Sequence, residues 1–207
     1  MKIINNSFEK ILITGGSGFI GTHLINHYRL NYPNYEILNL SIKKPMIESL
    51  NKYWTDCDIK DVDKTRSHFL AFKPTSVIHL AAKANLNGKT VEDFPDNTKG
   101  TKNIVRLIFQ TSSVKKFIHT STQYVCKPGK LPNSDTDFNP YTAYGASKAE
   151  SEKIVIKENL KCKWIIIRPT NIWGPWHPVF PYGLWKYLSK GYYFHPGKKP
   201  IIKHYGF

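Results

Sequence analysis

The fold of this chain is decided near its N-terminus by the stretch Ile11-Leu12-Ile13-Thr14-Gly15-Gly16-Ser17-Gly18-Phe19-Ile20-Gly21. Its short apolar run predicts a strand, its glycines predict a turn, and the following stretch, with Ile20, Leu24 and Tyr28 on one face, predicts a helix. A glycine fingerprint in the order strand, turn, helix is typical of dinucleotide binding. The alternative is a plain glycine-rich turn between two core elements.

Each glycine of the fingerprint has its own physical task. Gly15 permits the tight turn, Gly18 lets the backbone approach a pyrophosphate, and Gly21 lets the helix pack close to the strand. The helix that starts at Phe19 and Ile20 offers the N–H groups of its first turn, and the positive end of its dipole, to the phosphates. We therefore expect all five residues to contribute to a cofactor site.

Composition predicts one ordinary globular domain. The chain has 207 residues, of which 41% are hydrophobic, so it can bury a sizeable core. No apolar run approaches the length of a membrane span, and residues 1–10 lack the apolar segment of a signal peptide, so we expect a cytoplasmic protein without a membrane partner. Its three cysteines show no C-x-x-C spacing, so we expect no metal site.

The net charge of +15 raises the question of a nucleic-acid partner. The basic residues, however, are scattered as short groups, such as Lys43-Lys44, Lys115-Lys116 and Lys198-Lys199, rather than gathered in one stripe. A lysine-rich solvated surface that also attracts an anionic cofactor and substrate explains this charge better. We therefore expect no nucleic-acid partner.

Apolar strands alternate with helical patterns along the chain. Strands are predicted at residues 10–14, 35–40, 76–81, 116–121 and 163–168, and helices at 20–30, 62–72, 97–111 and 143–159. Strands of near-continuous Ile, Val and Leu indicate a parallel sheet that is covered on both faces. The alternation therefore predicts an α/β fold with a doubly wound parallel sheet.

A second chemical pattern is Tyr144-Gly145-Ala146-Ser147-Lys148. Residues four apart share a helix face, so the Lys148 ammonium can lie near the Tyr144 phenol. A neighbouring cation and an oxidised nicotinamide would both lower the pKa of the phenol, which is otherwise about 10. Thr122, at the end of a preceding strand, supplies a hydroxyl at the edge where doubly wound sheets bind ligands. The alternative for Tyr144 is a packed surface tyrosine.

These motifs, in their shared order, resemble the extended short-chain dehydrogenase/reductase family, the nucleotide-sugar epimerases and dehydratases. The resemblance covers nearly the whole chain and implies a Rossmann-type fold. It rests on several further segments of the sequence, namely Asp58-Ile59, His79-Leu80-Ala81-Ala82, Asn97, Thr122 and Val125, Arg168-Pro169-Thr170-Asn171 and Gly174-Pro175.

The resemblance also implies roles for individual residues. It makes Tyr144, Lys148 and Thr122 catalytic, with Lys148 also on the nicotinamide ribose. Further cofactor contacts fall on Ser41, Lys43, Asp58, Ile59, Leu80, Ala81, Ala82 and Pro169. Substrate contacts fall on Thr122, Asn171 and His177. For His177 and its neighbours Trp173 and Trp176, ordinary loop packing is an equal alternative.

The implied activity is NAD(P)-dependent hydride transfer on a nucleotide-linked sugar, either as an epimerase or as a 4-ketoreductase. Dehydratases of this family carry an acidic residue just after the catalytic Thr, whereas this chain has Gln123 and Tyr124, so 4,6-dehydration is disfavoured. Residues 1–168 would form the cofactor domain with its catalytic residues. Residues 169–207 would begin a substrate domain that is largely missing. A cofactor-binding protein without turnover is the alternative.

Cofactor choice depends on the end of the second strand, where NAD-specific relatives carry an acidic residue. Here that position falls on Ser41, or on Asn39 after a two-residue slip, and Lys43 and Lys44 follow. Loss of the repulsive carboxylate and gain of lysines favour NADP over NAD. The alternative is that Asn39 or Ser41 binds NAD through neutral hydrogen bonds.

The resemblance further implies a homodimer. Relatives pair through two helices from each subunit, which correspond here to residues 97–111 and 143–159. The candidates for the buried dimer face are Ile104, Leu107 and Ile108, with the intrachain core as the alternative.

Overall fold

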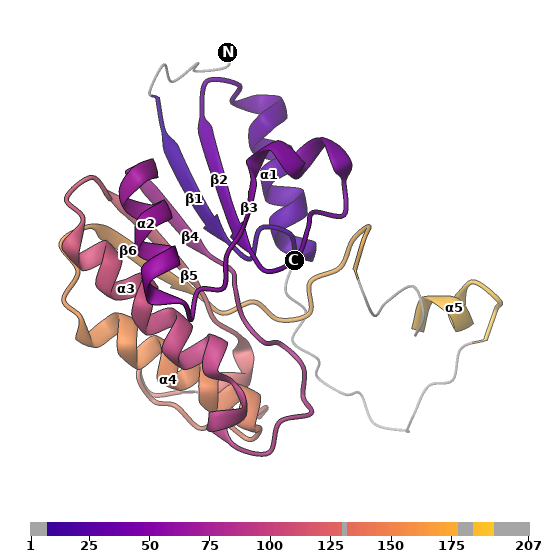
Figure 1. Ribbon diagram of the computed structural model, residues 1–207. Coiled ribbons are helices and arrows are strands. Elements are labelled where there is room, and N and C mark those ends of the chain that lie inside the picture. The colour runs from indigo at the N-terminus through magenta and orange to yellow at the C-terminus, as the bar shows by residue number, and fades with distance from the viewer. Residues whose placement is uncertain (1–7, 130–131, 178–183, 193–207) are drawn as a thin grey trace, which may run out of the picture. The chain divides into compact units, whose positions relative to one another are not determined.

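The computed structural model describes residues 8–129, 132–177 and 184–192. Its centre is a parallel sheet in the order β3-β2-β1-β4-β5-β6 (Figure 1). The strands are β1 (Lys10–Thr14), β2 (Glu36–Ser41), β3 (Trp54–Asp56), β4 (Ser76–His79), β5 (Lys116–Thr120) and β6 (Lys163–Ile167). The order runs outward from β1 in one direction and from β4 in the other, which confirms a doubly wound, Rossmann-like sheet.

Alternation along β1 explains how both faces of the sheet are covered. Leu12 points into a cluster with Phe69, Ile104 and Val155, which belong to α2 (Val62–Phe72), α3 (Thr101–Gln110) and α4 (Ala143–Lys157). Its neighbours Ile11 and Ile13 point to the other face, toward α1 (Phe19–Asn31). Because successive strand side chains point to opposite faces, one apolar run serves two helix layers.

Several element boundaries differ from the prediction. The strands predicted to reach Ala81, Ser121 and Arg168 end one or two residues earlier. β3 was not predicted, because three residues are too short to show a periodicity. The helix predicted over 97–111 is a π-helical turn, Asp96–Gly100, followed by α3. Short 3-10 turns occur at η1 (Glu48–Tyr53), η2 (Val91–Asp93) and η4 (Gln123–Val125).

The proposed dimer residues of α3 belong to the core of the single chain. Ile104, Leu107 and Ile108 are each no more than 5% exposed and pack in the same cluster as Leu12 of β1. Their assignment to a dimer face was therefore wrong. The physical reason is that the apolar face of α3 packs against the sheet and is buried there.

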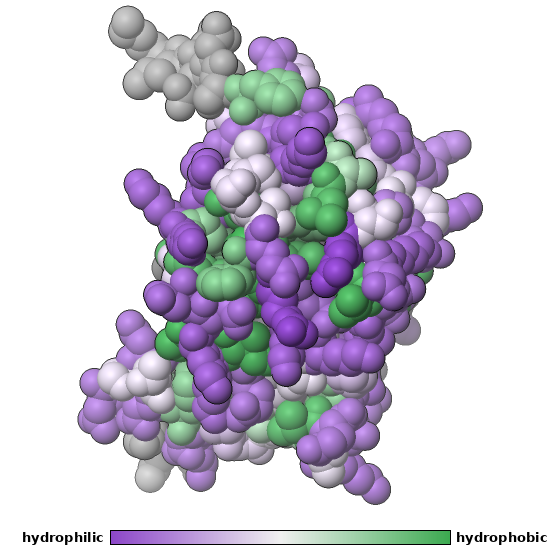
Figure 2. Space-filling view, turned by 60° about the vertical axis from the view of Figure 1, so that its left-hand side comes forward, coloured by the Kyte–Doolittle hydropathy of each residue, from purple (hydrophilic) through white to green (hydrophobic). Residues whose placement is uncertain are grey.

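The chain divides into two compact units, residues 1–168 and 169–207. The first holds the sheet and α1 to α4. In the second, the described residues include α5 (Leu184–Leu188). None of the helices in the described ranges has the length and apolar character needed to cross a membrane. The face shown in Figure 2 is mostly hydrophilic, with smaller hydrophobic patches.

Candidate functional site

The glycine turn between β1 and α1 has the tight geometry that the sequence predicts. Gly15 has a φ of +68°, and a Cβ there would lie 2.7 Å from the Ala81 backbone. Its N–H donates to the Leu40 carbonyl at 2.8 Å. A Cβ on Gly21 would lie 2.4 Å from the Gly16 Cα, so Gly21 packs against the turn itself rather than against the strand.

The start of α1 is built to receive an anion. Its N-cap residue, Gly18, provides no side-chain cap, and the first turn holds no acidic residue. A Cβ on Gly18 would meet only the Gly15 carbonyl oxygen, at 3.3 Å, so this position is open on its other sides. Uncapped N–H groups and the helix dipole favour a phosphate at such an end. Gly18, Phe19 and Ile20 therefore fit the diphosphate of a dinucleotide.

The glycine turn opens into a cavity of about 240 Å³, which we call the glycine-turn pocket. Nine predicted cofactor residues line it, namely Gly15, Gly18, Ser41, Lys43, Asp58, Ile59, Leu80, Ala81 and Ala82. Ser17, Leu40, Ile42, Cys57 and Asp96 also line it and were not predicted. The pocket lies at the carboxyl ends of β1, β2 and β4, where doubly wound sheets bind ligands.

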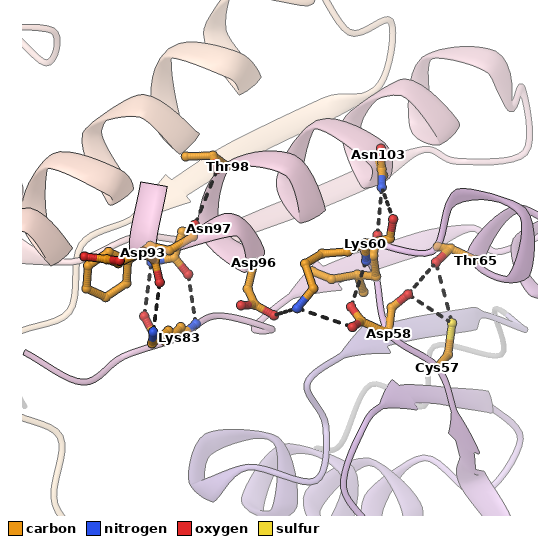
Figure 3. Close-up of polar contacts among 12 residues, drawn as sticks. Cys57, Asp58, Lys60, Thr65, Lys83, Asp93, Asp96, Asn97, Thr98 and Asn103 are labelled. Carbon is orange, nitrogen blue, oxygen red and sulfur yellow. Dashed lines mark hydrogen bonds and ion pairs between the residues drawn. The ribbon is translucent and has the colours of Figure 1, made fainter. Parts of the chain in front are cut away.

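Two carboxylates that line this pocket, those of Asp58 and Asp96, are bridged by the ammonium of Lys60 (Figure 3). Lys60 Nζ lies 2.8 Å from Asp96 Oδ1 and 3.3 Å from Asp58 Oδ2, and its backbone N–H donates to Asp58 Oδ1 at 2.9 Å. The hydrogen bond with Asp96 raises the pKa of Lys60. Asp58, which the sequence assigned to the cofactor, is thus fixed in place by Lys60.

The structure decides which residue of β2 faces the pocket. Asn39 is fully buried and donates from Nδ2 to Ser17 Oγ at 3.0 Å, so its assignment as the ribose-binding alternative was wrong. Ser41 lines the pocket, as does Lys43. The ammonium of Lys44 lies instead 5.9 Å from the centre of the Trp54 ring.

Thr122 and Tyr144 come together at the carboxyl end of β5. The Thr122 side chain accepts a hydrogen bond from the N–H of Tyr124. Burial raises the pKa of the Tyr144 phenol, and hydrogen bonding toward Thr122 lowers it by less. The sequence predicted a lowered pKa through Lys148, so this expectation is not met, because desolvation of the phenolate outweighs the hydrogen bond.

Lys148 lies one turn after Tyr144 on α4 and is only 2% exposed. Burial lowers its pKa to about 8, while the nearby Glu152 carboxylate raises it. The preceding residue, Ser147, accepts a hydrogen bond from Asn97 Nδ2 at 2.8 Å, which ties α4 to the π-helical turn. Lys148 is therefore a buried ammonium on which burial and the Glu152 carboxylate act in opposite directions.

Two buried histidines stack beneath this site. The rings of His79 and His119 lie 5.4 Å apart, and His79 bonds to the Thr14 hydroxyl at 2.6 Å and to the Thr101 hydroxyl at 3.0 Å. His119 bonds to the Ser151 hydroxyl at 2.9 Å. Burial lowers the pKa of His79 to about 3 and that of His119 well below its usual value. Both rings are therefore neutral parts of the core.

The sequence analysis did not identify Glu152, the buried carboxylate one helical turn after Lys148. Glu152 is 1% exposed, accepts from Ser121 Oγ, and is held by the guanidinium of Arg168. A signal was present, because Tyr144, Lys148 and Glu152 are spaced four apart and share one helix face.

The remaining predicted residues lie in the second unit. Pro169 is half-buried and Asn171 is exposed. His177 is half-buried, and burial lowers its pKa. Trp173 and Trp176 are 42% and 45% exposed. In the described part of the chain, no group of three or more His, Cys, Asp or Glu residues could hold a metal ion.

A doubly wound sheet, an uncapped glycine turn and a Tyr/Lys/Thr cluster at its carboxyl edge define a dinucleotide-binding protein of the oxidoreductase class. Residues 11–194 match the NAD dependent epimerase/dehydratase family. The chain belongs to this family, which is part of the extended short-chain dehydrogenase/reductases.

Several relatives are similar over most of this chain. The dTDP-D-glucose 4,6-dehydratase of Dictyostelium discoideum is 29% identical over 81% of this chain and 44% of its own length. The UDP-glucose 4-epimerase of Vibrio cholerae is 29% identical over 88% of this chain and 58% of its own. The enzyme WbmG of Bordetella bronchiseptica, solved with NAD, superimposes with a TM-score of 0.75 and 27% identity, over 91% of this chain and 62% of that one.

The chain thus spans about half the length of the curated relatives that it matches. The relatives include dTDP-D-glucose 4,6-dehydratases, UDP-glucose 4-epimerases and a sterol-4-alpha-carboxylate 3-dehydrogenase of Candida albicans, and solved structures of this fold contain NAD or NADP.

Proposed function

We propose that this chain is the cofactor-binding and catalytic part of an NAD(P)-dependent epimerase or reductase that acts on a nucleotide-linked sugar. The observation that carries the proposal is the placement of buried Thr122, after β5, and of Tyr144 and buried Lys148, one turn apart on α4, at the carboxyl edge of the sheet. The glycine-turn pocket at the same edge of the sheet supports a dinucleotide there. Membership of the epimerase/dehydratase family supports the class of substrate.

The protein groups have separate tasks in the proposed reaction. Tyr144 takes the proton of a sugar hydroxyl while the hydrogen on the same carbon departs as a hydride, so that the alcohol becomes a ketone. A bound oxidised nicotinamide would supply the hydride acceptor and a positive charge that favours the phenolate form of Tyr144. Thr122 donates a hydrogen bond to the reacting oxygen. Lys148 would hold the nicotinamide ribose.

Epimerisation and ketone reduction both need only this proton and hydride transfer, so the chain supports either. In an epimerase the keto-sugar would rotate in the site, and the hydride would return to the opposite face of the same carbon. In a 4-ketoreductase both transfers would run in reverse: Tyr144 would give its proton to the ketone oxygen, a reduced cofactor would supply the hydride, and the alcohol and oxidised cofactor would leave. Dehydration needs an acid that protonates the departing hydroxyl, and the residues after Thr122 are Gln123 and Tyr124, which are not acids. We therefore expect no 4,6-dehydratase activity.

The proposed reaction is tested by replacing Tyr144 with phenylalanine. Loss of the phenolic proton carrier is expected to lower turnover by about 10²- to 10⁴-fold and to leave the cofactor dissociation constant nearly unchanged. Turnover is followed with UDP- and dTDP-sugars by NMR of the sugar and by absorbance of the reduced cofactor. Stoichiometric cofactor consumption identifies a reductase, and its absence an epimerase.

The matched control is Tyr141→Phe. Tyr141 lies three residues earlier, is 46% exposed and stacks on Tyr124 with ring centres 5.4 Å apart. We expect it to keep turnover within about threefold of the parent. If Tyr144→Phe also stayed within a few-fold, the assignment of Tyr144 would be wrong. Cofactor binding without turnover on any sugar nucleotide, in the full-length protein, would support a binding protein instead.

A further inference from the structure

Glu152 has a carboxylate that is almost completely buried. It is 1% exposed and lies on the innermost side of α4. Ser121 Oγ donates to its Oε1, and Arg168 donates from Nε at 2.9 Å to Oε1 and from Nη2 at 2.7 Å to Oε2. A buried carboxylate is costly unless it is paired and hydrogen-bonded, and here it is both.

This carboxylate joins the elements that carry the catalytic groups. Ser121 immediately precedes Thr122 at the end of β5, and Glu152 follows Lys148 by one turn of α4. Arg168 follows β6, donates to the Asp135 carbonyl, and lies with its guanidinium 5.5 Å from the centre of the Phe138 ring. Glu152 therefore sets the position of α4 relative to the strand end that carries Thr122.

Among the groups that face the Lys148 ammonium, Glu152 carries the negative charge. From β4 and β5 it meets His79 and His119, whose rings are neutral and whose protonation its own charge disfavours. On α4 it has the neutral phenol of Tyr144 on one side and Glu152 on the other. Glu152 lies four residues after Lys148 on the same face of α4, both side chains are at most 2% exposed, and the carboxylate raises the pKa of Lys148.

We propose that Glu152 is a positioning residue of the reaction: through Ser121 and Arg168 it holds α4, with Tyr144 and Lys148, against the strand end that carries Thr122, and it places a buried negative charge one helical turn from Lys148. Arg168 neutralises part of that charge, so Glu152 and Arg168 act on the proton affinity of Lys148 in opposite directions. This inference rests on the proposed function in one respect, the part that Lys148 plays in catalysis.

The test is a titration of the Lys148 side chain by NMR on protein with isotope-labelled lysine, with Lys148→Arg to assign the signal. Glu152→Gln keeps the size of the side chain and removes its charge, and is expected to lower the pKa of Lys148 by about one unit, a tenfold change in proton affinity. Arg168→Gln leaves Glu152 less neutralised and is expected to raise the pKa. A purely structural role predicts no such opposite shifts.

The matched control is Glu150→Gln. Glu150 also lies on α4, but it is exposed and paired with Lys153 at 2.7 Å, so its loss should leave the Lys148 titration within about 0.2 unit. If a single variant fails to fold, the double variant Glu152→Gln with Arg168→Met removes the buried carboxylate together with its guanidinium partner. There too the pKa of Lys148 should fall, because Glu152 acts on it from one turn away. An unchanged or raised pKa in the folded Glu152→Gln or double variant would overturn the proposal.

Turnover provides an independent readout. In Glu152→Gln the alkaline limb of the pH profile should move to lower pH together with the Lys148 titration, whereas simple damage lowers turnover at every pH. The titration needs no substrate. Absence of turnover in the parent would therefore count against the proposed function, while the shift of Lys148 would still support Glu152 as its charge partner.

Discussion

At the scale of single residues, two adjacent lysines after β2 have different surroundings. Lys43 lines the glycine-turn pocket beside Ser41, whereas the Lys44 ammonium packs over the Trp54 ring. Ser41 lacks the carboxylate that would repel a 2′-phosphate, and only Lys43 lies where it could attract one. The preference for NADP over NAD that the sequence predicts therefore depends on Lys43 rather than on the lysine pair.

We expect Lys43→Ala to weaken NADP⁺ binding about tenfold, the effect of losing one charge-assisted contact, and to leave NAD⁺ binding within about twofold. Lys44→Ala is the matched control and should change neither dissociation constant. Calorimetric titration of both cofactors against the parent and the two variants measures these constants. Tighter binding of NAD⁺ by the parent, unmoved by Lys43→Ala, would reverse the preference.

At the scale of elements, the centre of the sheet is sensitive to acid. β4 and β5 each place a histidine in the core, and burial holds the pKa of His79 near 3 and that of His119 well below its usual value. The unfolded chain binds a proton at each histidine near pH 6.5, whereas the folded chain does not. Stability from these groups is therefore complete above about pH 6.5 and is lost as the pH falls below it.

We expect the free energy of unfolding to fall between pH 6 and pH 5 by up to about 1.4 kcal/mol per pH unit for each histidine. Lys148, with a pKa near 8, is protonated throughout that range and adds no slope. Denaturant titrations at several pH values measure the slope. His119→Asn should reduce it by about one proton, and His27→Asn, an exposed position on α1, should not. An equal slope in the parent and His119→Asn would contradict the prediction.

At the scale of the whole molecule, the outer surfaces of α3 and α4 bear on how copies of the chain assemble. The buried stripe of α3 belongs to the core, so a pair formed through α3 and α4 would have to use their outer surfaces. Those surfaces expose Phe109 and Ile156, which are 49% and 37% accessible. Exposed apolar residues on neighbouring helices are compatible with a contact between copies.

We propose a homodimer in solution and expect light scattering at micromolar concentration to give twice the mass of the chain. Introducing charges through Phe109→Glu and Ile156→Glu should reduce the mass to that of a monomer, because buried unpaired charges oppose association. Leu70→Glu, at a 50% exposed position on α2, is the control. A parent that is monomeric at that concentration would contradict the proposal.

The sequence by itself determined the features that depend on local order. The alternation of apolar runs and helical patterns predicted the doubly wound sheet, because strand and helix periods are written in neighbouring residues. The glycine spacing predicted the turn, since a positive φ and a 2.7 Å approach to Ala81 allow no side chain at Gly15. The spacing of four predicted that Tyr144 and Lys148 share a helix face.

The tertiary structure alone decided which side chains are withdrawn from water and which are brought together from distant elements. It buried Asn39 and the stripe of α3, and it raised the pKa of Tyr144 where local spacing predicted a decrease. It also joined Glu152 to Arg168, 16 residues apart, behind Lys148. Burial and long-range pairing depend on how the helices and the sheet pack together. Local sequence spacing does not predict that packing.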